Sequence, residues 1–407
     1  MAPRALWSYC KKAEPIMNTQ KRNLYILLLV LFVVMLGYGM ISPLLPFYIE
    51  DMGAGGTELG LLVASYAVMR MVCGPIWGGL SDRVGRKPIL LIGIFGYVIT
   101  MLWFGLADRL WMLFAARILA GILSSATSPT TMAFVSDSTL EAERGGGMGL
   151  LGAAAGVGTI LGPVLGGLLG DESIALPFLI AAGLAALSLL LAWIFLPESL
   201  PPEKRQPGKS GKGFIDLRAW LAAVRSPVGP LFNLTFISTC GLMIFASVFG
   251  LYALERFNYG PKETGMMLMV LGLVSALIQG VFAGPLTRRW GDSAVLKASL
   301  LASALSFGFL LLADSYLTIL LATAFFGFTV ALQVPSLTAM TSKRSEVPPG
   351  IAMGLSNAFI SLGRIFGPIL GGLLLDHNLV LPYLAGAAVM LLGFVFSLGQ
   401  KKQLQPV

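Results

Sequence analysis

Long apolar runs alternate with short polar segments along the whole chain. Each run is continuous and does not alternate between apolar and polar residues, which favours helices over a membrane barrel. A helix needs about 20 apolar residues to cross the hydrocarbon core of a bilayer. The pattern predicts an all-α polytopic membrane protein whose twelve transmembrane helices lie near 23–48, 57–80, 89–107, 111–135, 147–169, 174–196, 229–254, 264–285, 295–313, 317–340, 350–375 and 380–399.

Charge is scarce and unevenly distributed. Charged residues make up 12% of the 407 residues, whereas soluble domains average about a quarter. Most basic residues fall on one side of the predicted helices, and only Arg109, Arg256 and Lys262 fall on the other. Because Lys and Arg gather in cytoplasmic loops, both termini are predicted to be cytoplasmic, in the cell inner (plasma) membrane. The net charge of +8 follows from this asymmetry, so the expected partner is the lipid bilayer and not nucleic acid.

Residue types that carry catalytic or metal chemistry are rare. The chain has three cysteines and one histidine, which predicts neither a metal site nor a disulfide framework. It contains no phosphate-binding Gly-Lys loop and no catalytic triad order. We therefore expect no enzyme activity and no cofactor.

The second half of the chain repeats the first. The segment Gly284–Gly291 follows Gly78–Gly85 at a spacing of 206 residues, and a row of glycines and prolines recurs at a spacing of 205 residues. Such duplication is typical of transporters that rock two halves about a central site. We predict two pseudo-symmetric six-helix bundles at 23–197 and 229–399, a linker at 198–228 with an amphipathic helix at 214–224, and cytoplasmic tails at 1–22, taken as disordered, and 400–407.

Three arginines lie within the apolar runs: Arg70, Arg117 and Arg364. An arginine near the bilayer centre costs on the order of 3 kcal/mol, so each should face the bundle interior and find a partner or water. For Arg70, bonds to the carbonyls of a neighbouring helix and contact with a substrate remain open alternatives. Arg117 precedes a run of hydroxyl residues that includes Ser128, and this combination favours the wall of a hydrated cavity.

Two motifs resemble those of a known family. The charged turn Gly78–Pro88 is similar at nearly every position to the loop signature between helices 2 and 3 of the major facilitator superfamily. Gly149 with Gly158–Gly167 resembles the helix-5 motif of its twelve-helix drug:proton antiporter branch, which includes tetracycline and multidrug exporters. The resemblance covers nearly the whole chain. It implies a monomeric, proton-coupled, alternating-access efflux transporter of small amphipathic or hydrophobic compounds.

The resemblance also implies roles for charged residues. In the outward-facing state Asp82 would lie against the amino end of helix 11, near 348–350, where the positive end of the helix dipole favours an anion. Arg83 would pair with Asp137 or Glu143, and Arg117 resembles an arginine implicated in proton transfer. The proton is the expected coupling ion, and its coupling and gating residues are expected to be Asp82, Arg83, Arg86, Arg117, Asp137 and Glu143.

Small residues are expected to join the two bundles. By resemblance, Gly162, Pro163, Gly166 and Gly167 would form a seam with helix 8, while Gly367, Pro368 and Gly371 would form one with helix 2. The complete helix-packing set is Gly149, Gly158, Gly162, Pro163, Gly166, Gly167, Gly363, Gly367, Pro368 and Gly371. The substrate cavity is expected to be lined by Tyr38, Ser42, Tyr66, Arg70, Arg117, Ser128, Asn233, Phe249, Gln333, Asn357 and Arg364.

The chain departs from many cationic-drug exporters of this family, which carry an acidic residue within helix 1, 4 or 5. All twenty of its carboxylates fall in loops or near helix ends. Either Asp82 and Asp137 near the cytoplasmic face perform the coupling, or the membrane arginines select an anionic or zwitterionic substrate. The alternative function is therefore a carrier specific for an anionic metabolite or a lipid-like amphiphile.

Overall fold

A computed structural model describes residues 4–139, 141–205, 228–344 and 349–400. Within these ranges it is built from helices, twelve of which are long and apolar enough to cross a membrane. These confirm the predicted spans. The stretch expected to be a disordered tail is instead helical from Arg4, continuous with the first span. The predicted linker helix at 214–224 and the end of the second tail, 401–407, lie outside the described residues.

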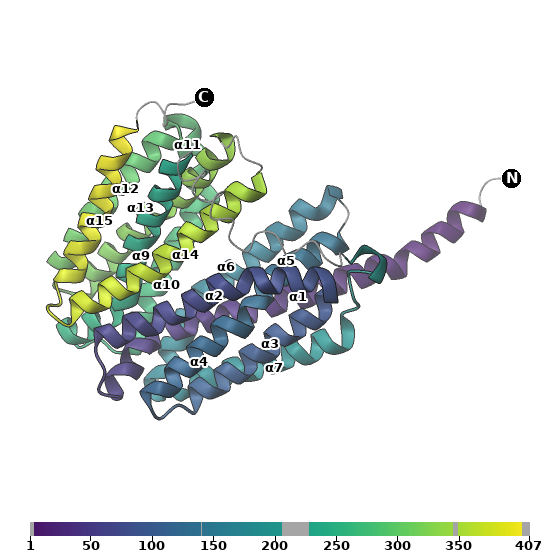
Figure 1. Cartoon of the computed structure of the whole chain (residues 1–407), viewed down its shortest axis with the longest axis horizontal. Helices are drawn as coiled ribbons and strands as arrows, with labels where there is room; N and C mark the ends of the chain where they lie inside the picture. Colours follow the sequence, from purple (N-terminus) through teal and green to yellow (C-terminus); the bar gives the residue numbers. More distant parts are fainter. Residues whose placement is uncertain (1–3, 140, 206–227, 345–348, 401–407) are drawn as a thin grey trace.

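The N-terminal half supplies the first six spans. Its helices are α1 (Arg4–Asp51), α2 (Gly56–Val84), α3 (Arg86–Gly105), α4 (Leu110–Leu123) continued through η1 (Ser124–Ala126) into α5 (Thr127–Ser138), α6 (Glu141–Glu172) and α7 (Ala175–Phe195), followed by the short η2 (Pro202–Lys204). Together they form one bundle, drawn in purple to teal in Figure 1. One buried apolar cluster lies between its helices, and a larger one contains residues of both bundles.

The C-terminal half supplies the other six spans. Its helices are α9 (Gly229–Phe257), α10 (Pro261–Leu277) continued through the π-helical η3 (Ile278–Phe282) into α11 (Ala283–Trp290), α12 (Asp292–Leu312), α13 (Tyr316–Arg344), α14 (Pro349–Leu375) and α15 (Leu381–Gly399). This second bundle, green to yellow, lies at an angle to the first (Figure 1). The order of elements confirms two six-helix bundles.

The repeat extends to the turns. Gly85 ends α2 with φ of +122°, and its counterpart Gly291 ends α11 with φ of +80°. L-residues with a side chain rarely adopt these values, so glycine is required at both positions. Each glycine reverses the chain directly into the next span.

The repeat also extends to an ion pair behind each turn. In the first bundle Arg86 Nε lies 2.9 Å from Asp137 Oδ2. In the second, Lys343 Nζ lies 2.7 Å from Asp292 Oδ2. Asp292 and Lys343 stand at the positions equivalent to Arg86 and Asp137, 206 residues later, so the two charges have exchanged places. The ion pair thus fastens the turn to the end of the fourth span in both halves.

The glycine row on α6 packs mainly within its own bundle. A Cβ added to Gly158 would lie 2.7 Å from the Phe32 carbonyl oxygen of α1, and Gly162 and Gly166 likewise contact the α1 backbone. The expectation that this row as a whole faces helix 8 is therefore wrong. Of the four residues expected in this seam, Pro163 and Gly167 do contact α10, because they lie on the neighbouring face of the helix, and the prediction is confirmed for these two.

The equivalent row on α14 behaves in the same way. Gly363, Gly367 and Gly371 contact α9 of their own bundle, so the expected seam with helix 2 is wrong for Gly367 and Gly371. It is confirmed for Pro368, whose backbone contacts α2, and the backbone of Gly372 contacts α2 as well. Small residues repeated every four positions share one helix face, and that face meets one neighbour. Gly149 has no described atom within 4 Å of an added Cβ.

Among the described residues, the helices of the two bundles pack closely near one end of the molecule and diverge toward the other. We call the end with Asp82 and Arg83 the basic face, and the end with the loop Met52–Gly55 the opposite face. Near the opposite face Gly56 of α2 packs backbone to backbone on Gly372 of α14. Toward the basic face, an added Cβ would meet no neighbouring helix within 4 Å at any of four glycines on α2, η3 and α14, namely Gly74, Gly78, Gly280 and Gly354. The bundles therefore diverge toward the basic face, as Figure 1 shows.

Candidate transport site

A pocket lies where the bundles begin to diverge. Its lining comes from α1, α2 and α4 of the first bundle and from α9 and α14 of the second, with a volume of about 30 Å³. This volume holds one or two waters, far less than the several hundred Å³ of a drug-sized site. The structure thus brings five predicted cavity residues into one place, the complete lining being Tyr38, Val63, Tyr66, Ala67, Arg70, Arg117, Met243, Ser361 and Arg364.

Aromatic rings hold the arginines of the first bundle. The Arg117 guanidinium lies 5.5 Å from the centre of the Tyr66 ring and 5.7 Å from that of Phe104. Such cation–π contacts stabilise a cation where a carboxylate is absent. Arg70 Nη1 makes a long hydrogen bond of 3.5 Å to the Tyr66 hydroxyl. Tyr66 also packs against Tyr38, with ring centres 5.9 Å apart.

At the basic face, Arg86 holds two carboxylates. Its guanidinium lies 2.6 Å from Asp82 Oδ1 and 2.9 Å from Asp137 Oδ2, and it also donates to the Ser81 hydroxyl. Asp137 therefore pairs with Arg86 in this conformation; the sequence predicted that, in the outward-facing state, Arg83 would pair with Asp137 or Glu143. The Asp82 side chain is 52% exposed, and Glu143 is exposed as well. Of the two carboxylates that Arg86 holds, Asp82 is thus the more exposed.

Comparison with known proteins identifies the architecture. Residues 27–291 and 231–405 match the profile of the Major Facilitator Superfamily. The chain belongs to this superfamily. It is 31% identical over 387 residues to Multidrug resistance protein 2 of Bacillus subtilis (strain 168), covering 95% of this chain and 97% of that protein. It is 28% identical over 386 residues to Quinolone resistance protein NorA of Staphylococcus aureus (strain MSSA476), covering 94% of this chain and 97% of that protein.

Solved structures of the superfamily have the same fold. A POT family transporter in complex with 5-aminolevulinic acid matches with a TM-score of 0.80 at 15% sequence identity, covering 95% of this chain and 97% of that chain. Membership of this superfamily makes the chain a multi-pass membrane transporter and not an enzyme.

Two predicted cavity residues of the transporter lie elsewhere. Phe249 is fully buried, and its ring centre is 4.7 Å from that of Phe245 inside the second bundle. Gln333 is also fully buried and donates to the Ser303 hydroxyl at 2.8 Å. The expectation that these two side chains face the cavity is wrong for this conformation, because each points into the interior of its own bundle.

The remaining predicted cavity residues do not line the pocket either. Asn357 is exposed on α14, and its carbonyl accepts the Ser361 hydroxyl. Ser42, Ser128 and Asn233 are half-buried on α1, α5 and α9. They share helices or spans with the pocket residues but lie at other positions along them.

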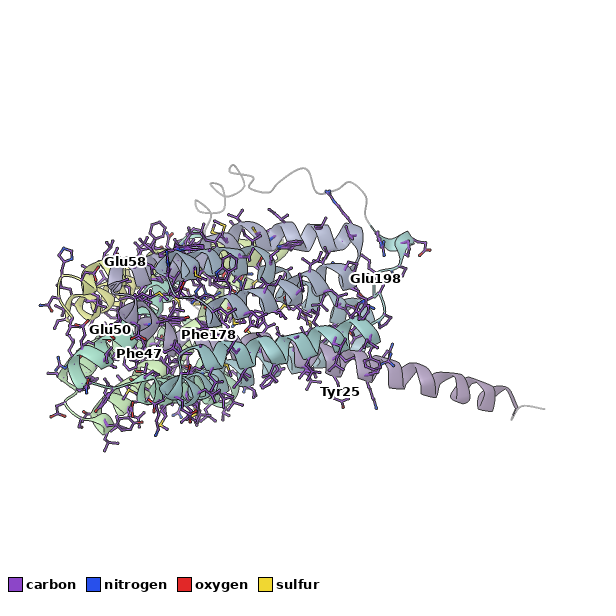
Figure 2. The ribbon with its side chains drawn as sticks, turned by 90° about the horizontal axis from the view of Figure 1, so that it is seen from below. Tyr25, Phe47, Glu50, Glu58, Phe178 and Glu198 are labelled. Carbon is purple, nitrogen blue, oxygen red and sulfur yellow. The ribbon has the colours of Figure 1, made fainter. Side chains whose placement is uncertain are left out.

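A structural carboxylate at the basic face escaped the sequence predictions. Glu198, just after α7, accepts from the backbone N–H groups of Arg86 at 2.8 Å and Lys87 at 3.2 Å. It thereby caps the amino end of α3, where a helix favours an anion. Figure 2 shows Glu198 at the end of the bundle remote from Glu50 and Glu58. The only sequence signal was an acidic residue directly after the apolar run.

Asp376 is a second carboxylate that was missed, and it joins the two bundles. It follows α14 and accepts the backbone N–H of Gly56 at 2.6 Å and of Thr57 at 2.9 Å, together with the Thr57 hydroxyl. Burial alone would raise the pKa of Asp376, but these hydrogen bonds outweigh it and lower the pKa below its ordinary value of 3.8. Asp376 thus caps α2 from the other bundle and fastens the opposite face.

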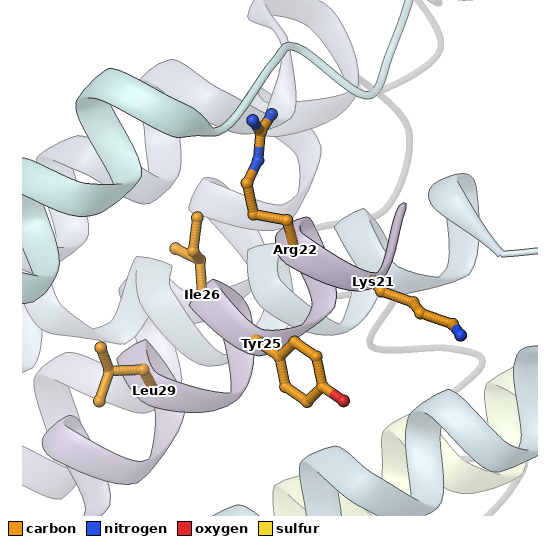
Figure 3. Close-up of a pocket in the computed structure, with 5 residues that line it drawn as sticks. All are labelled: Lys21, Arg22, Tyr25, Ile26 and Leu29. Carbon is orange, nitrogen blue, oxygen red and sulfur yellow. The ribbon is translucent and has the colours of Figure 1, made fainter. Parts of the chain in front are cut away.

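A shallow pocket lies along the surface of α1 near the basic face (Figure 3). It is lined by Lys21, Arg22, Tyr25, Ile26 and Leu29. Arg22 turns away from Lys21 and Tyr25 and donates to the Phe195 carbonyl at 3.2 Å. Basic and aromatic residues commonly flank a membrane span at the level of the lipid headgroups. We therefore interpret this surface as the boundary of the first span and not as part of the transport site.

Proposed function

We propose that this transporter is a proton-coupled antiporter that exports small amphipathic or hydrophobic compounds by alternating access. The observation that carries the proposal is the pocket, which both bundles line and which lies at the apex of an opening toward the basic face. Full-length similarity to proteins named for multidrug and quinolone resistance supports the substrate class. The concentration of basic residues supports a cytoplasmic basic face, with both termini cytoplasmic in the inner membrane.

Asp82 is the proposed coupling carboxylate. In this conformation it pairs with Arg86 and remains half exposed. When the basic face closes, Asp82 would approach the amino end of α14, which begins at Pro349. A helix amino end attracts the ionised carboxylate and not the protonated one. Protonation of Asp82 therefore favours the inward-open state, and its deprotonation favours the outward-open state, so one proton biases the rocking of the bundles.

The other members of this cluster have a positioning role in the proposal. Arg86 and Asp137 belong to the same bundle, so rocking need not separate them. The second bundle has the same ion pair with reversed charges, Asp292 and Lys343, at the equivalent positions. A pair that tolerates reversal of its charges fastens a turn and does not itself carry the transported proton. We therefore assign Arg86 and Asp137 to holding the turn on which Asp82 stands.

The test uses purified transporter in proteoliposomes with an imposed pH gradient and a fluorescent amphipathic dye. Wild type is expected to accumulate the dye only while the gradient persists, and a protonophore should abolish accumulation. Asp82→Asn should lose gradient-driven accumulation yet keep exchange of dye down its own gradient. Asp108→Asn removes an exposed carboxylate at the opposite face and is the matched control. Accumulation that survives both the protonophore and Asp82→Asn would contradict proton coupling through Asp82.

A second function has one observation in its favour. The pocket holds Arg70, Arg117 and Arg364 without a lining carboxylate, which suits a carrier specific for an anionic metabolite or a lipid-like amphiphile. Such a carrier would reject neutral and cationic dyes altogether. Dye transport in the proteoliposomes above therefore separates the two functions.

A further inference from the structure

We infer that Arg70, Arg117 and Arg364 form a subsite for an anionic group of the exported compound. The inference rests on the proposed export function and narrows its substrate class. The compounds expected to bind best carry a carboxylate, sulfonate or phosphate group beside an aromatic or apolar body.

The first observation is uncompensated charge. Arg70 and Arg117 lie on α2 and α4 of the first bundle, and Arg364 lies on α14 of the second, yet all three line one small pocket. No Asp or Glu is among the described lining residues, and within the described parts of the chain none of the three arginines forms an ion pair. Guanidinium groups stay protonated in proteins. A bound anion would relieve their mutual repulsion.

The second observation is a buried donor without an acceptor. Arg117 is only 6% exposed, and its Nε has no hydrogen-bond partner among the described residues. The rings of Tyr66 and Phe104 stabilise its charge but accept no conventional hydrogen bond. Leaving a buried donor unpaired is unfavourable. A carboxylate or phosphate oxygen is the acceptor that matches the planar fork of a guanidinium.

The shape of the pocket sets the rest of the class. Its volume of about 30 Å³ admits the anionic head alone, so the body of the compound must extend into the opening between the bundles. Tyr38, Val63 and Met243 give the pocket an aromatic and apolar rim. Flexible methionine and large aromatic side chains adapt to varied apolar groups. An anionic head at the arginines with an apolar body beyond them fits this arrangement.

Because Arg364 comes from the other bundle, an anion at the subsite would be held by both bundles at once. Binding would then favour a conformation in which the bundles close around the compound. The subsite would thus serve both recognition and the conformational change, while Asp82 at the basic face responds to the proton.

The experiment compares one xanthene dye that has a free benzoate carboxylate with the methyl ester of the same dye. Equilibrium binding to the purified full-length transporter is measured by fluorescence anisotropy, and transport is measured in proteoliposomes. Wild type is expected to bind the acid at least about tenfold more tightly than the ester. Arg70→Gln and Arg364→Gln should each remove most of that preference, whereas Arg70→Lys and Arg364→Lys should restore part of it. Arg109→Gln, which removes an exposed arginine at the opposite face, is the matched control.

These variants avoid Arg117, whose substitution would disturb the aromatic packing around it. Loss of acid preference with retained binding of the ester marks a role in anion recognition, because a purely structural defect would weaken both dyes alike. Equal binding of the two dyes by wild type, or no binding of the acid, overturns the inference. Transport of the ester without preference for the acid would overturn the subsite but leave the export function standing. A binding preference for the acid without any gradient-driven transport would leave the subsite standing but overturn the export function.

Discussion

One of the contacts that close the opposite face depends on a single carboxylate. Asp376 of one bundle accepts two backbone N–H groups and one hydroxyl from the amino end of α2 in the other. Asp376→Asn keeps one oxygen acceptor but loses the negative charge and at least one of these hydrogen bonds. At this exposed position we expect the closed conformation to lose about 1 kcal/mol relative to the open one. The population ratio of the two should then change about fivefold.

The assay is a distance measurement between spin labels at Ser173 of the first bundle and Asp314 of the second, both in exposed loops at the opposite face. The background replaces Cys10, Cys73 and Cys240. Asp376→Asn is expected to enlarge the population with long distances, and Asp376→Ala should enlarge it further. Asp108→Asn is the control because it removes an exposed carboxylate from the same face without touching the contact of Asp376 with Gly56 and Thr57.

Lowering the pH should imitate the substitution. The pKa of Asp376 is held below its ordinary value of 3.8 in the closed conformation. A group with a lowered pKa stabilises that conformation above its ordinary pKa, and the stabilisation is lost as pH falls through the lowered value. Glu58 on α2 and the neighbouring His377 are the other titratable groups at this contact. Label distances that stay the same in Asp376→Asn and across the acidic pH range would show that the Asp376 contact does not hold the opposite face closed.

Three further predictions follow from the same contacts. Gly167→Leu should hold the opposite face open and abolish transport, because its Cβ would meet the backbone of α10 at Pro261 and Gly265. The open face should make cysteines introduced there more accessible to a thiol reagent, and unchanged accessibility would count against close packing of α6 on α10. Arg86→Asp should lower the melting temperature, and Arg86→Asp combined with Asp137→Lys should recover it, because the second bundle has the same ion pair with its charges in that order. Equal melting temperatures of the single and double variants would refute the structural role of this ion pair. Glu198→Gln should lower the melting temperature by destabilising the start of α3, whereas Glu203→Gln on the exposed segment after it should not.

The sequence predicted the fold because its strongest signals are local. Apolar runs long enough to span a bilayer located all twelve helices. A constant offset between distant glycines indicated the duplication, and the turns at Gly85 and Gly291 confirm it in their backbone geometry. Both signals depend on length and spacing alone. The first tail was misjudged, because polar residues with helical propensity continue the helix of α1 back to Arg4.

The sites were harder to predict because they depend on which helix faces which. Tyr66, Arg70 and Arg117 could be placed near a cavity because charged and hydroxyl groups within a span need polar partners or water. Phe249 and Gln333 looked equally suitable, yet they point into the second bundle. The contacts of Asp376 with Thr57 and of Glu198 with Arg86 join residues far apart in the chain. No local pattern encodes such pairs.

The sequence also did not predict which end of the molecule is closed. Most glycines in the rows of α6 and α14 pack within their own bundles, whereas other motif residues, such as Gly167 and Pro368, meet the other bundle as predicted. Which end of the molecule is closed follows from those few contacts.

Direct measurement of proton movement tests the antiport mechanism most directly. Proteoliposomes loaded with an amphipathic dye and a pH indicator are diluted into dye-free buffer, so that the dye leaves down its gradient. Proton-coupled antiport predicts that protons enter as the dye leaves, and that Asp82→Asn releases dye without moving protons. Dye release by wild type with no change in internal pH would contradict proton-coupled antiport.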